Sequence, residues 1–282
     1  MIKLITTFII FASIIFFNAA NAQDFHGQAI YESKVSMKDK IQINNSEGMT
    51  EAMRQQLAET MKKAFEKTFV MNFNKQESVY FQEEKLEAPK PNSSMNVAVI
   101  KSNTDGKNYK NIKEKIQVSE EDIFGKEFLV VDSLKVWNWK LENETKKIGN
   151  YICNKATAVI PVSEEDKKAY EENKKKKGDG KTQFITVSEP KEQIITVWYT
   201  PEIPVSQGPD EYWGLPGLIL EANDGQTIFL CSKITLNPKE KSEIKRPTKG
   251  KKVNRKEYDK IFKEKIESMT DSKGMINIKV GG

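Results

Sequence analysis

The chain has 282 residues, of which 38% are hydrophobic and 30% are charged, and its mean hydropathy is −0.61. This composition excludes collagen, continuous coiled coils and wholly disordered chains, and it confines any membrane-grade apolar run to a terminus. The formal net charge of +5 is unevenly distributed, because residues 239–282 contain 14 Lys or Arg against 7 Asp or Glu.

Residues 1–22 have the pattern of a secretory signal peptide. Lys3 precedes an apolar run from Leu4 to Phe17, and small residues up to Ala22 occupy the positions that a signal peptidase reads. The run is shorter than the roughly 20 residues of a membrane-spanning helix. We therefore predict cleavage after Ala22, a periplasmic or secreted protein, and no transmembrane helix in the mature chain.

The first predicted elements are a strand, a helix and a hairpin. Residues 27–37 alternate apolar and polar side chains, which predicts a half-buried strand. Between Thr50 and Phe65, apolar residues recur every three or four positions, which predicts one amphipathic helix. Two β-rich runs, 68–73 and 78–82, are separated by four residues and predict a hairpin.

Short β-rich runs with turn signals between them fill most of the chain as far as residue 238. They comprise residues 96–101, 107–112, 127–131, 136–141, 151–160, 184–187, 193–200, 218–221 and 227–234. Consecutive strands without helices between them favour an antiparallel meander over a parallel nucleotide-binding sheet. We therefore predict a mainly β, α+β fold, in which residues 23–238 form one domain built on a curved antiparallel sheet or half-open barrel.

One stretch inside this domain, residues 163–181, is dominated by Lys and Glu. It cannot bury enough apolar area to offset the entropy that ordering would cost. We predict a flexible charged insertion between two strands.

Residues 239–282 are predicted to form a basic C-terminal extension. Asn254 and Glu257 have the spacing of a capping box, and the apolar residues that follow share one face, so a helix is expected over 255–269. Residues 241–256 contain eight Lys or Arg and one Glu. Such a stretch contacts polyanions or lipid headgroups in many proteins, and a solvated arm is the alternative.

Two cysteines, Cys153 and Cys231, lie in apolar, strand-like runs. In an exported chain they can form a disulfide, and as free thiols they behave as small buried hydrophobes. The sequence does not supply the separation of their Cα atoms, so both alternatives stay open.

The residue inventory argues against the common catalytic and metal-binding patterns. His26 is the one histidine of the sequence, which excludes paired-His zinc sites and makes Ser-His or Cys-His catalysis depend on the N-terminal end of the mature chain. Carboxylate pairs such as Glu120-Glu121 lie in polar contexts. We predict no metal, no cofactor and no enzymatic activity.

The most unusual segment runs from residue 197 to residue 224. Pro201, Pro204 and Pro209 restrict the backbone in succession. Pro216-Gly217 is the pair that a type II turn prefers at its centre, where Gly supplies a positive φ. The segment therefore predicts a stiff corner joining two strands.

At this corner the chain resembles the GLPGLI family, secreted or periplasmic proteins of Bacteroidota, through Gly214-Leu215-Pro216-Gly217-Leu218-Ile219. The preceding Trp198-Tyr199-Thr200, the block 139–158 and the pairing of Tyr31 with residues 78–80 also look like the family. The resemblance implies export but no established activity. The order of elements is similar to periplasmic carriers of the LolA type, which implies a half-open barrel with a helix on its concave side.

Three aromatic residues at the corner, Trp198, Tyr212 and Trp213, are candidate ligand contacts at the mouth of a cavity. The alternative is that the corner only shapes the fold. We interpret the protein as a non-enzymatic component of the cell envelope that binds an apolar, lipid-like ligand in a half-barrel cavity. A second interpretation is an interaction module for an outer-membrane β-barrel or transport protein, and a third is a carboxylate-based hydrolase.

Overall fold

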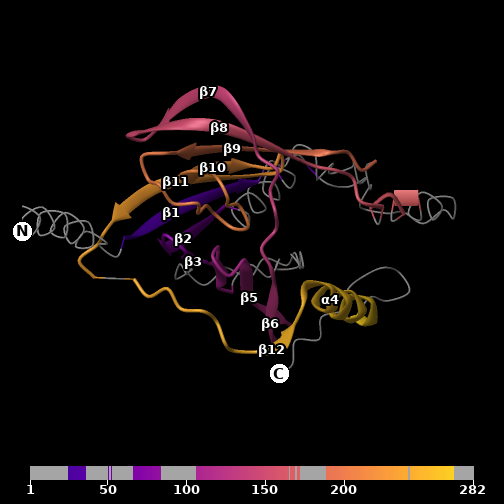
Figure 1. Cartoon of the computed structure of the whole chain (residues 1–282). Helices are drawn as coiled ribbons and strands as arrows, with labels where there is room; N and C mark the ends of the chain where they lie inside the picture. The colour runs from indigo at the N-terminus through magenta and orange to yellow at the C-terminus, as the bar shows by residue number, and fades with distance from the viewer. Residues whose placement is uncertain are drawn as a thin grey trace, which may run out of the picture.

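The computed structural model describes residues 25–35, 66–83, 106–164, 189–240 and 242–269, with isolated positions 50, 52, 166–168, 170 and 171. Within these residues the chain is mostly β and forms one curved, open sheet of 12 strands (Figure 1). The predicted mainly β fold with a curved sheet is confirmed. The predicted signal peptide, the body of the helix between Thr50 and Phe65, and the strands at 96–101 and 184–187 lie outside the described residues.

The strands are β1 (His26–Val35), β2 (Lys67–Asn74), β3 (Glu77–Gln82), β4 (Asn108–Asn111), β5 (Ile116–Ile123), β6 (Lys126–Ser133), β7 (Lys140–Ile148), β8 (Tyr151–Ile160), β9 (Gln193–Thr200), β10 (Leu218–Asn223), β11 (Thr227–Leu236) and β12 (Lys251–Val253). The helix α4 (Arg255–Met269) follows β12. Three strands differ from the sequence prediction. β5 and β12 were not expected, and β7 begins where the strand predicted at 136–141 was expected to end.

The spatial order of the sheet is β12-β6-β5-β4-β3-β2-β1-β11-β10-β9-β8-β7. Neighbouring strands are antiparallel except β12, which pairs with β6 in parallel. The predicted hairpin is the β2–β3 pair, whose turn is closed by Asn74 Oδ1, which accepts from the backbone N–H groups of Gln76 and Glu77 at 2.8 and 2.7 Å. Short-range turn chemistry therefore sets the register here.

The connector of residues 134–139 explains why the sheet is curved. It joins β6 to β7, which lie ten strand positions apart in the sheet. In a flat sheet this separation would be about 47 Å, whereas the seven backbone steps from Ser133 to Lys140 span at most about 25 Å. The two ends of the sheet must therefore approach each other, and the connector closes the open side of the half-barrel (Figure 1).

The loop of residues 201–217 between β9 and β10, here called the Pro-Gly corner, folds across the concave face of the sheet. Ser78 Oγ on β3 donates to Gln207 Oε1 at 3.0 Å, and Tyr31 on β1 donates to the carbonyl of Ile219, just past the corner, at 2.7 Å. In the sheet, β3 lies four positions from β10 and β1 lies two. The half-barrel is therefore filled in part by its own loop.

The turn at Pro216-Gly217 differs from the predicted type II geometry. Gly214 has the positive φ, +97°, and Gly217 is absent from the residues with positive φ. A Cβ at Gly217 would lie 2.2 Å from the carbonyl oxygen of Thr200. Gly217 is therefore needed because two backbone segments meet there, and not because of its φ.

The C-terminal extension is packed along the sheet as far as residue 269. The capping box is confirmed: Glu257 N donates to Asn254 Oδ1 at 2.9 Å, and Asn254 N donates to Glu257 Oε2 at 3.0 Å. Tyr258 on α4 packs edge-on against Phe128 of β6, with ring centroids 5.7 Å apart. The basic stretch is partly neutralised by the sheet, since Lys249 pairs with Glu127 at 2.6 Å. No helix in the described part of the chain is long and apolar enough to cross a bilayer.

The charged insertion predicted over 163–181 begins with a short helical segment. Ser163 caps this segment, because Asp166 N donates to its Oγ at 3.0 Å, and residues 166–168 are helical.

Cys153 and Cys231 are free and buried in the same apolar cluster. Burial raises their pKa values to about 11 and about 12, so both are neutral thiols at pH 7.

Candidate functional site

Lys110 holds the Pro-Gly corner against β4. Its side chain is fully buried, and Nζ donates to the carbonyls of Gly208, Asp210 and Tyr212 at 2.7, 2.6 and 3.2 Å. Burial lowers the pKa of this amine to about 8, because a charged group in the interior loses its hydration. The three carbonyls replace the lost water as hydrogen-bond acceptors, and the Lys110 amine in turn fixes their position.

Indole groups join the corner to the connector. Trp137 and Trp139 donate through Nε1 to the carbonyls of Glu211 and Trp213 at 3.0 and 2.8 Å. Trp213 donates in return to the carbonyl of Lys135 at 2.8 Å. Trp137 and Trp139 also stack on each other, with centroids 5.2 Å apart. The open side of the half-barrel is thereby fastened to the corner.

The three candidate ligand contacts have different surroundings. Tyr212 is buried, with its ring 5.2 Å from that of Trp137. Trp213 is half-buried in the joint just described, and half-buried Trp198 lies on β9 under Lys146 Nζ, 4.4 Å from its ring. None of the three lines the cavity described next. Their role as ligand contacts stays a prediction.

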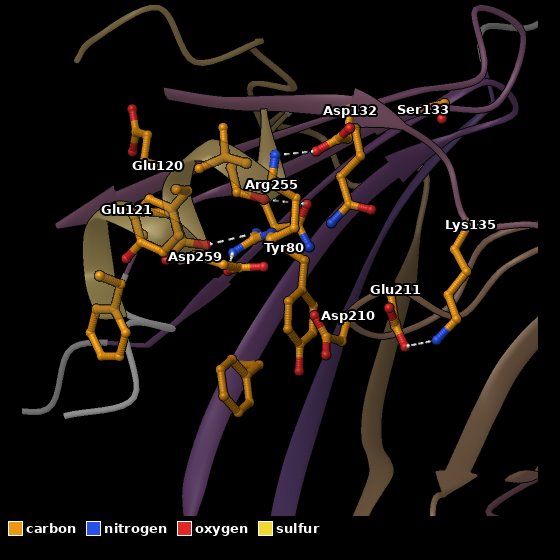
Figure 2. Close-up of a pocket in the computed structure, with 18 of the residues that line it drawn as sticks. Tyr80, Glu120, Glu121, Asp132, Ser133, Lys135, Asp210, Glu211, Arg255 and Asp259 are labelled. Atoms are coloured by element: carbon orange, nitrogen blue, oxygen red, sulfur yellow. Dashed lines mark hydrogen bonds and ion pairs between the residues drawn. The ribbon is translucent and has the colours of Figure 1, made fainter. Parts of the chain in front are cut away.

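A cavity of about 680 Å³ lies between the concave face of the sheet, the Pro-Gly corner and α4 (Figure 2). Its lining comprises Phe69, Tyr80, Gly106, Asn108, Gln117, Ser119, Glu120, Glu121, Val130, Asp132, Ser133, Lys135, Asp210, Glu211, Phe229, Arg255, Tyr258, Asp259 and Phe262. Segments from β2 to α4 therefore meet here, although they are almost 200 residues apart in sequence.

Aromatic side chains form one wall of the cavity. Phe69 stacks on Tyr80 with centroids 4.9 Å apart, and Phe229 meets Phe69 edge-on at 6.0 Å. Tyr258 and Phe262 on α4 stack at 6.4 Å. Such rings offer a large apolar area for the body of a ligand.

Carboxylates are concentrated on the polar side of the cavity. Arg255 Nη2 pairs with Glu121 at 3.1 Å, and its backbone N–H donates to Asp132 at 2.6 Å. Lys135 pairs with Glu211 at 2.8 Å (Figure 2). Burial raises the pKa of Glu121, and the Arg255 guanidinium opposes that rise.

Asp210 forms no ion pair with a described residue, and in contrast to Asp132 its carboxylate accepts no described backbone N–H. Burial, followed by the charge of neighbouring Glu211, raises its pKa to about 6. Lys110 stabilises the ionised form only in part, because the amine is directed to backbone carbonyls. Asp210 also has φ +47°, a conformation that Asp tolerates better than most residues.

The hydroxyl of Tyr80 is buried in the cavity wall and has no hydrogen-bond partner among the described residues. Burial raises the pKa of Tyr80 well above its usual value, and the charge of Asp210 adds to the rise. Tyr31 makes an instructive contrast, since its ring lies 6.3 Å from that of Tyr80 and its hydroxyl is satisfied by Ile219.

Sequence reasoning did not identify Lys110, Tyr80, Asp210 or Arg255 as site residues. Tyr80 and Lys110 lie in ordinary β-rich runs, and Arg255 lies in a run of basic residues. Their importance depends on which distant segments pack against them. The sequence signal that came nearest was the unusual density of Pro and Gly around Asp210.

Comparison with known proteins yields a family match and distant structural likenesses. Two solved structures of PNGF-II, in space groups C2 and P21, match with TM-scores of 0.48 and 0.47 and 14% sequence identity. The matches cover 86% of this chain, which spans about a third of theirs (33% and 34%). No curated protein sequence matches. Residues 139–221, which include the whole Pro-Gly corner, match a family described as "Protein of unknown function (Porph_ging)".

Proposed function

We propose that the protein is a non-enzymatic binding protein of the cell envelope that holds the apolar body of a small ligand in the cavity between the sheet, the Pro-Gly corner and α4. The observation that carries the proposal is the cavity itself. Its volume of about 680 Å³ lies within the range of small-molecule sites, roughly 300–1,000 Å³. The aromatic wall supplies apolar contact, and the polar side supplies groups that orient a ligand.

We also infer that the chain is exported and belongs to the GLPGLI family. The leader pattern of residues 1–22 supports export, and the family match at 139–221 contains the hexapeptide from Gly214 to Ile219. Both inferences agree with a ligand-binding role in the envelope. Cleavage after Ala22 is checked by the intact mass of the exported protein.

A second candidate function is docking to an envelope protein, which exposed apolar residues near the β7 edge support. Val159 and Ile194 are direct cross-strand neighbours on β8 and β9 and are 57% and 60% exposed, while Ile152 is 61% exposed. Large exposed apolar side chains beside an edge strand favour contact with a partner. Capture from envelope extracts distinguishes the candidates, since a carrier retains a small molecule and a docking module retains a protein.

The test of the leading proposal is a fluorescence titration of the mature protein with N-phenylnaphthylamine, a neutral apolar probe. Gln117 on β5 lines the cavity, whereas the exposed Thr145 on β7 lies outside the cavity lining. Gln117→Trp should fill the cavity and weaken binding at least tenfold. Thr145→Trp is the matched control and should bind like the wild type. Absence of binding to the wild type, or equal binding by both variants, would overturn the proposal.

A further inference from the structure

We propose that the ligand's polar end is an organic cation bearing N–H donors, an alkylammonium or guanidinium group, received by the Asp210 carboxylate and the Tyr80 hydroxyl. This inference rests on the proposed function, because it assigns the head group of the ligand whose apolar body the cavity holds. Figure 2 shows the Tyr80 ring extending from beside Arg255 toward Asp210, whose charge also acts on the Tyr80 hydroxyl.

The balance of charge in the cavity favours a cation. Six acidic residues line it, Glu120, Glu121, Asp132, Asp210, Glu211 and Asp259, against the two basic residues Lys135 and Arg255. An anionic ligand would meet a surplus of negative charge in a partly desolvated space, where repulsion is weakly screened.

The cations already present are committed to other carboxylates. Lys135 pairs with Glu211 at 2.8 Å, and Arg255 pairs with Glu121 at 3.1 Å and lies 4.0 Å from Asp259. Within the described chain, the Asp210 carboxylate has neither an ion pair nor a hydrogen bond from a backbone N–H, and its side-chain donor is the neutral Asn108. A cationic ligand would complete the charge balance at that point.

The Tyr80 hydroxyl provides an independent argument. Tyr80 is 4% exposed, and its hydroxyl lines the cavity without a partner among the described residues. A buried polar group that stays unpaired destabilises the protein, because it has lost its hydration without a replacement. A ligand N–H placed between Tyr80 and Asp210 would donate to both oxygens, which a carboxylate ligand could not do.

The shape of the site favours an organic cation over a metal ion. Within the described residues, no three His, Cys, Asp or Glu side chains are grouped so as to hold a metal. The stacked pair of Phe69 and Tyr80 instead presents aromatic faces. Such faces attract an ammonium or guanidinium group through the negative electrostatic potential of the ring.

The proposal is tested by calorimetric titration of the mature protein at pH 7.5 with ligands of one chain length. Octylammonium should bind at least tenfold more tightly than octanol, and octanoate more weakly than octanol. Octyltrimethylammonium, which carries the charge but has no N–H, should bind more weakly than octylammonium. Equal binding of octanol and octylammonium overturns this inference and leaves the proposed function standing. If none of these ligands nor N-phenylnaphthylamine binds, the proposed function fails as well.

Two variants locate the head group. Tyr80→Phe and Asp210→Asn should each reduce the preference for octylammonium over octanol at least fivefold, with octanol binding unchanged. Asp122→Asn removes one negative charge from an exposed position on β5 outside the cavity lining and should keep the full preference. If Asp122→Asn reduces the preference as much as Asp210→Asn, the attraction is a property of overall charge and the proposed contact is wrong.

A basic side chain of a peptide and a free amine share this chemistry. Titration with lysine blocked at both its amino and carboxyl backbone groups, beside octylamine, distinguishes the two sources. Tighter binding of blocked lysine assigns the site to a peptide, and tighter binding of octylamine assigns it to a free amine. Failure of both to bind, with octanol still bound, overturns the inference.

Discussion

The Pro-Gly corner and the cavity beside it use polar groups in opposite ways. In the corner, the carbonyls of Gly208, Tyr212 and Trp213 accept hydrogen bonds from side chains of distant segments. In the cavity, the Tyr80 hydroxyl has no described partner and Asp210 no described ion pair. Buried polar groups in native proteins are normally paired. The comparison therefore separates groups that determine the fold from groups left available for a ligand.

The largest loss of stability is expected at Lys110, whose side chain donates to three backbone carbonyls of the corner. Lys110→Met keeps much of the apolar volume but leaves three carbonyls without their donor. We expect a loss of about 3–5 kcal/mol in the free energy of unfolding, measured with urea. Lys113→Met, an exposed lysine in the following turn, should change it by less than about 0.5 kcal/mol. Equal midpoints for both variants would mean that Lys110 does not hold the corner.

The next effect tests the close backbone approach at the corner. Gly217→Ala would place Cβ 2.2 Å from Thr200 O, so one backbone segment must move, at a cost of about 2–3 kcal/mol. Gly214→Ala meets its nearest heavy atom at 3.7 Å, in Trp139, and should cost about 1–2 kcal/mol through its positive φ alone. Thermal unfolding of both variants checks the order. A greater loss for Gly214→Ala would mean that the close approach to Thr200 is not the stronger constraint at the corner.

The same comparison explains how much of the molecule could be predicted. The β2–β3 hairpin and the Asn254–Glu257 capping box rest on contacts within a few residues, and both were predictable from sequence. β5 was not, because three consecutive acidic residues, 120–122, break its alternation. The connector 134–139 looked like part of a strand because Trp137 and Trp139 alternate with polar or exposed neighbours. Their partners are carbonyls more than 70 residues away.

The sequence predicted that the curved sheet encloses a cavity, but it did not predict which residues line that cavity. A curved sheet with an interior space followed from the number of strands, whereas the identity of its lining depends on which segments cross the concave face. Tyr31 and Tyr80 show why, since both are buried tyrosines in strands. Ile219 lies within reach of one hydroxyl and not of the other. Local sequence does not encode that difference.

The two tyrosines supply a smaller and sharper test. Tyr31→Phe removes the donor to Ile219 O and should lower the free energy of unfolding by about 1 kcal/mol. Tyr80→Phe removes a hydroxyl without a described partner and should leave stability unchanged or slightly higher. Urea unfolding of both variants without ligand checks this contrast. Equal losses would show that the Tyr80 hydroxyl is satisfied in solution.

The smallest expected effect is the pH dependence contributed by Asp210. Burial and Glu211 raise its pKa to about 6 in the folded chain, against about 3.9 for an unperturbed Asp. The folded state therefore binds this proton more tightly, so the contribution of Asp210 to stability falls as pH rises from about 4 to about 6 and is constant above that range. Lys110 and Lys135 oppose the shift, and the side chain is partly exposed, so the change should be below about 1 kcal/mol.

Asp210→Asn isolates that contribution, because Asn accepts the same positive φ and cannot ionise. In the wild type, Asp210 lowers the urea midpoint at pH 7 relative to that at pH 4.5. This decrease should be smaller in the variant. The slope should not vanish completely, since burial also raises the pKa of Glu121. An unchanged slope would mean that Asp210 is hydrated like a surface carboxylate. In that event, the contrast between paired polar groups in the corner and unpaired polar groups in the cavity would rest on Tyr80 alone.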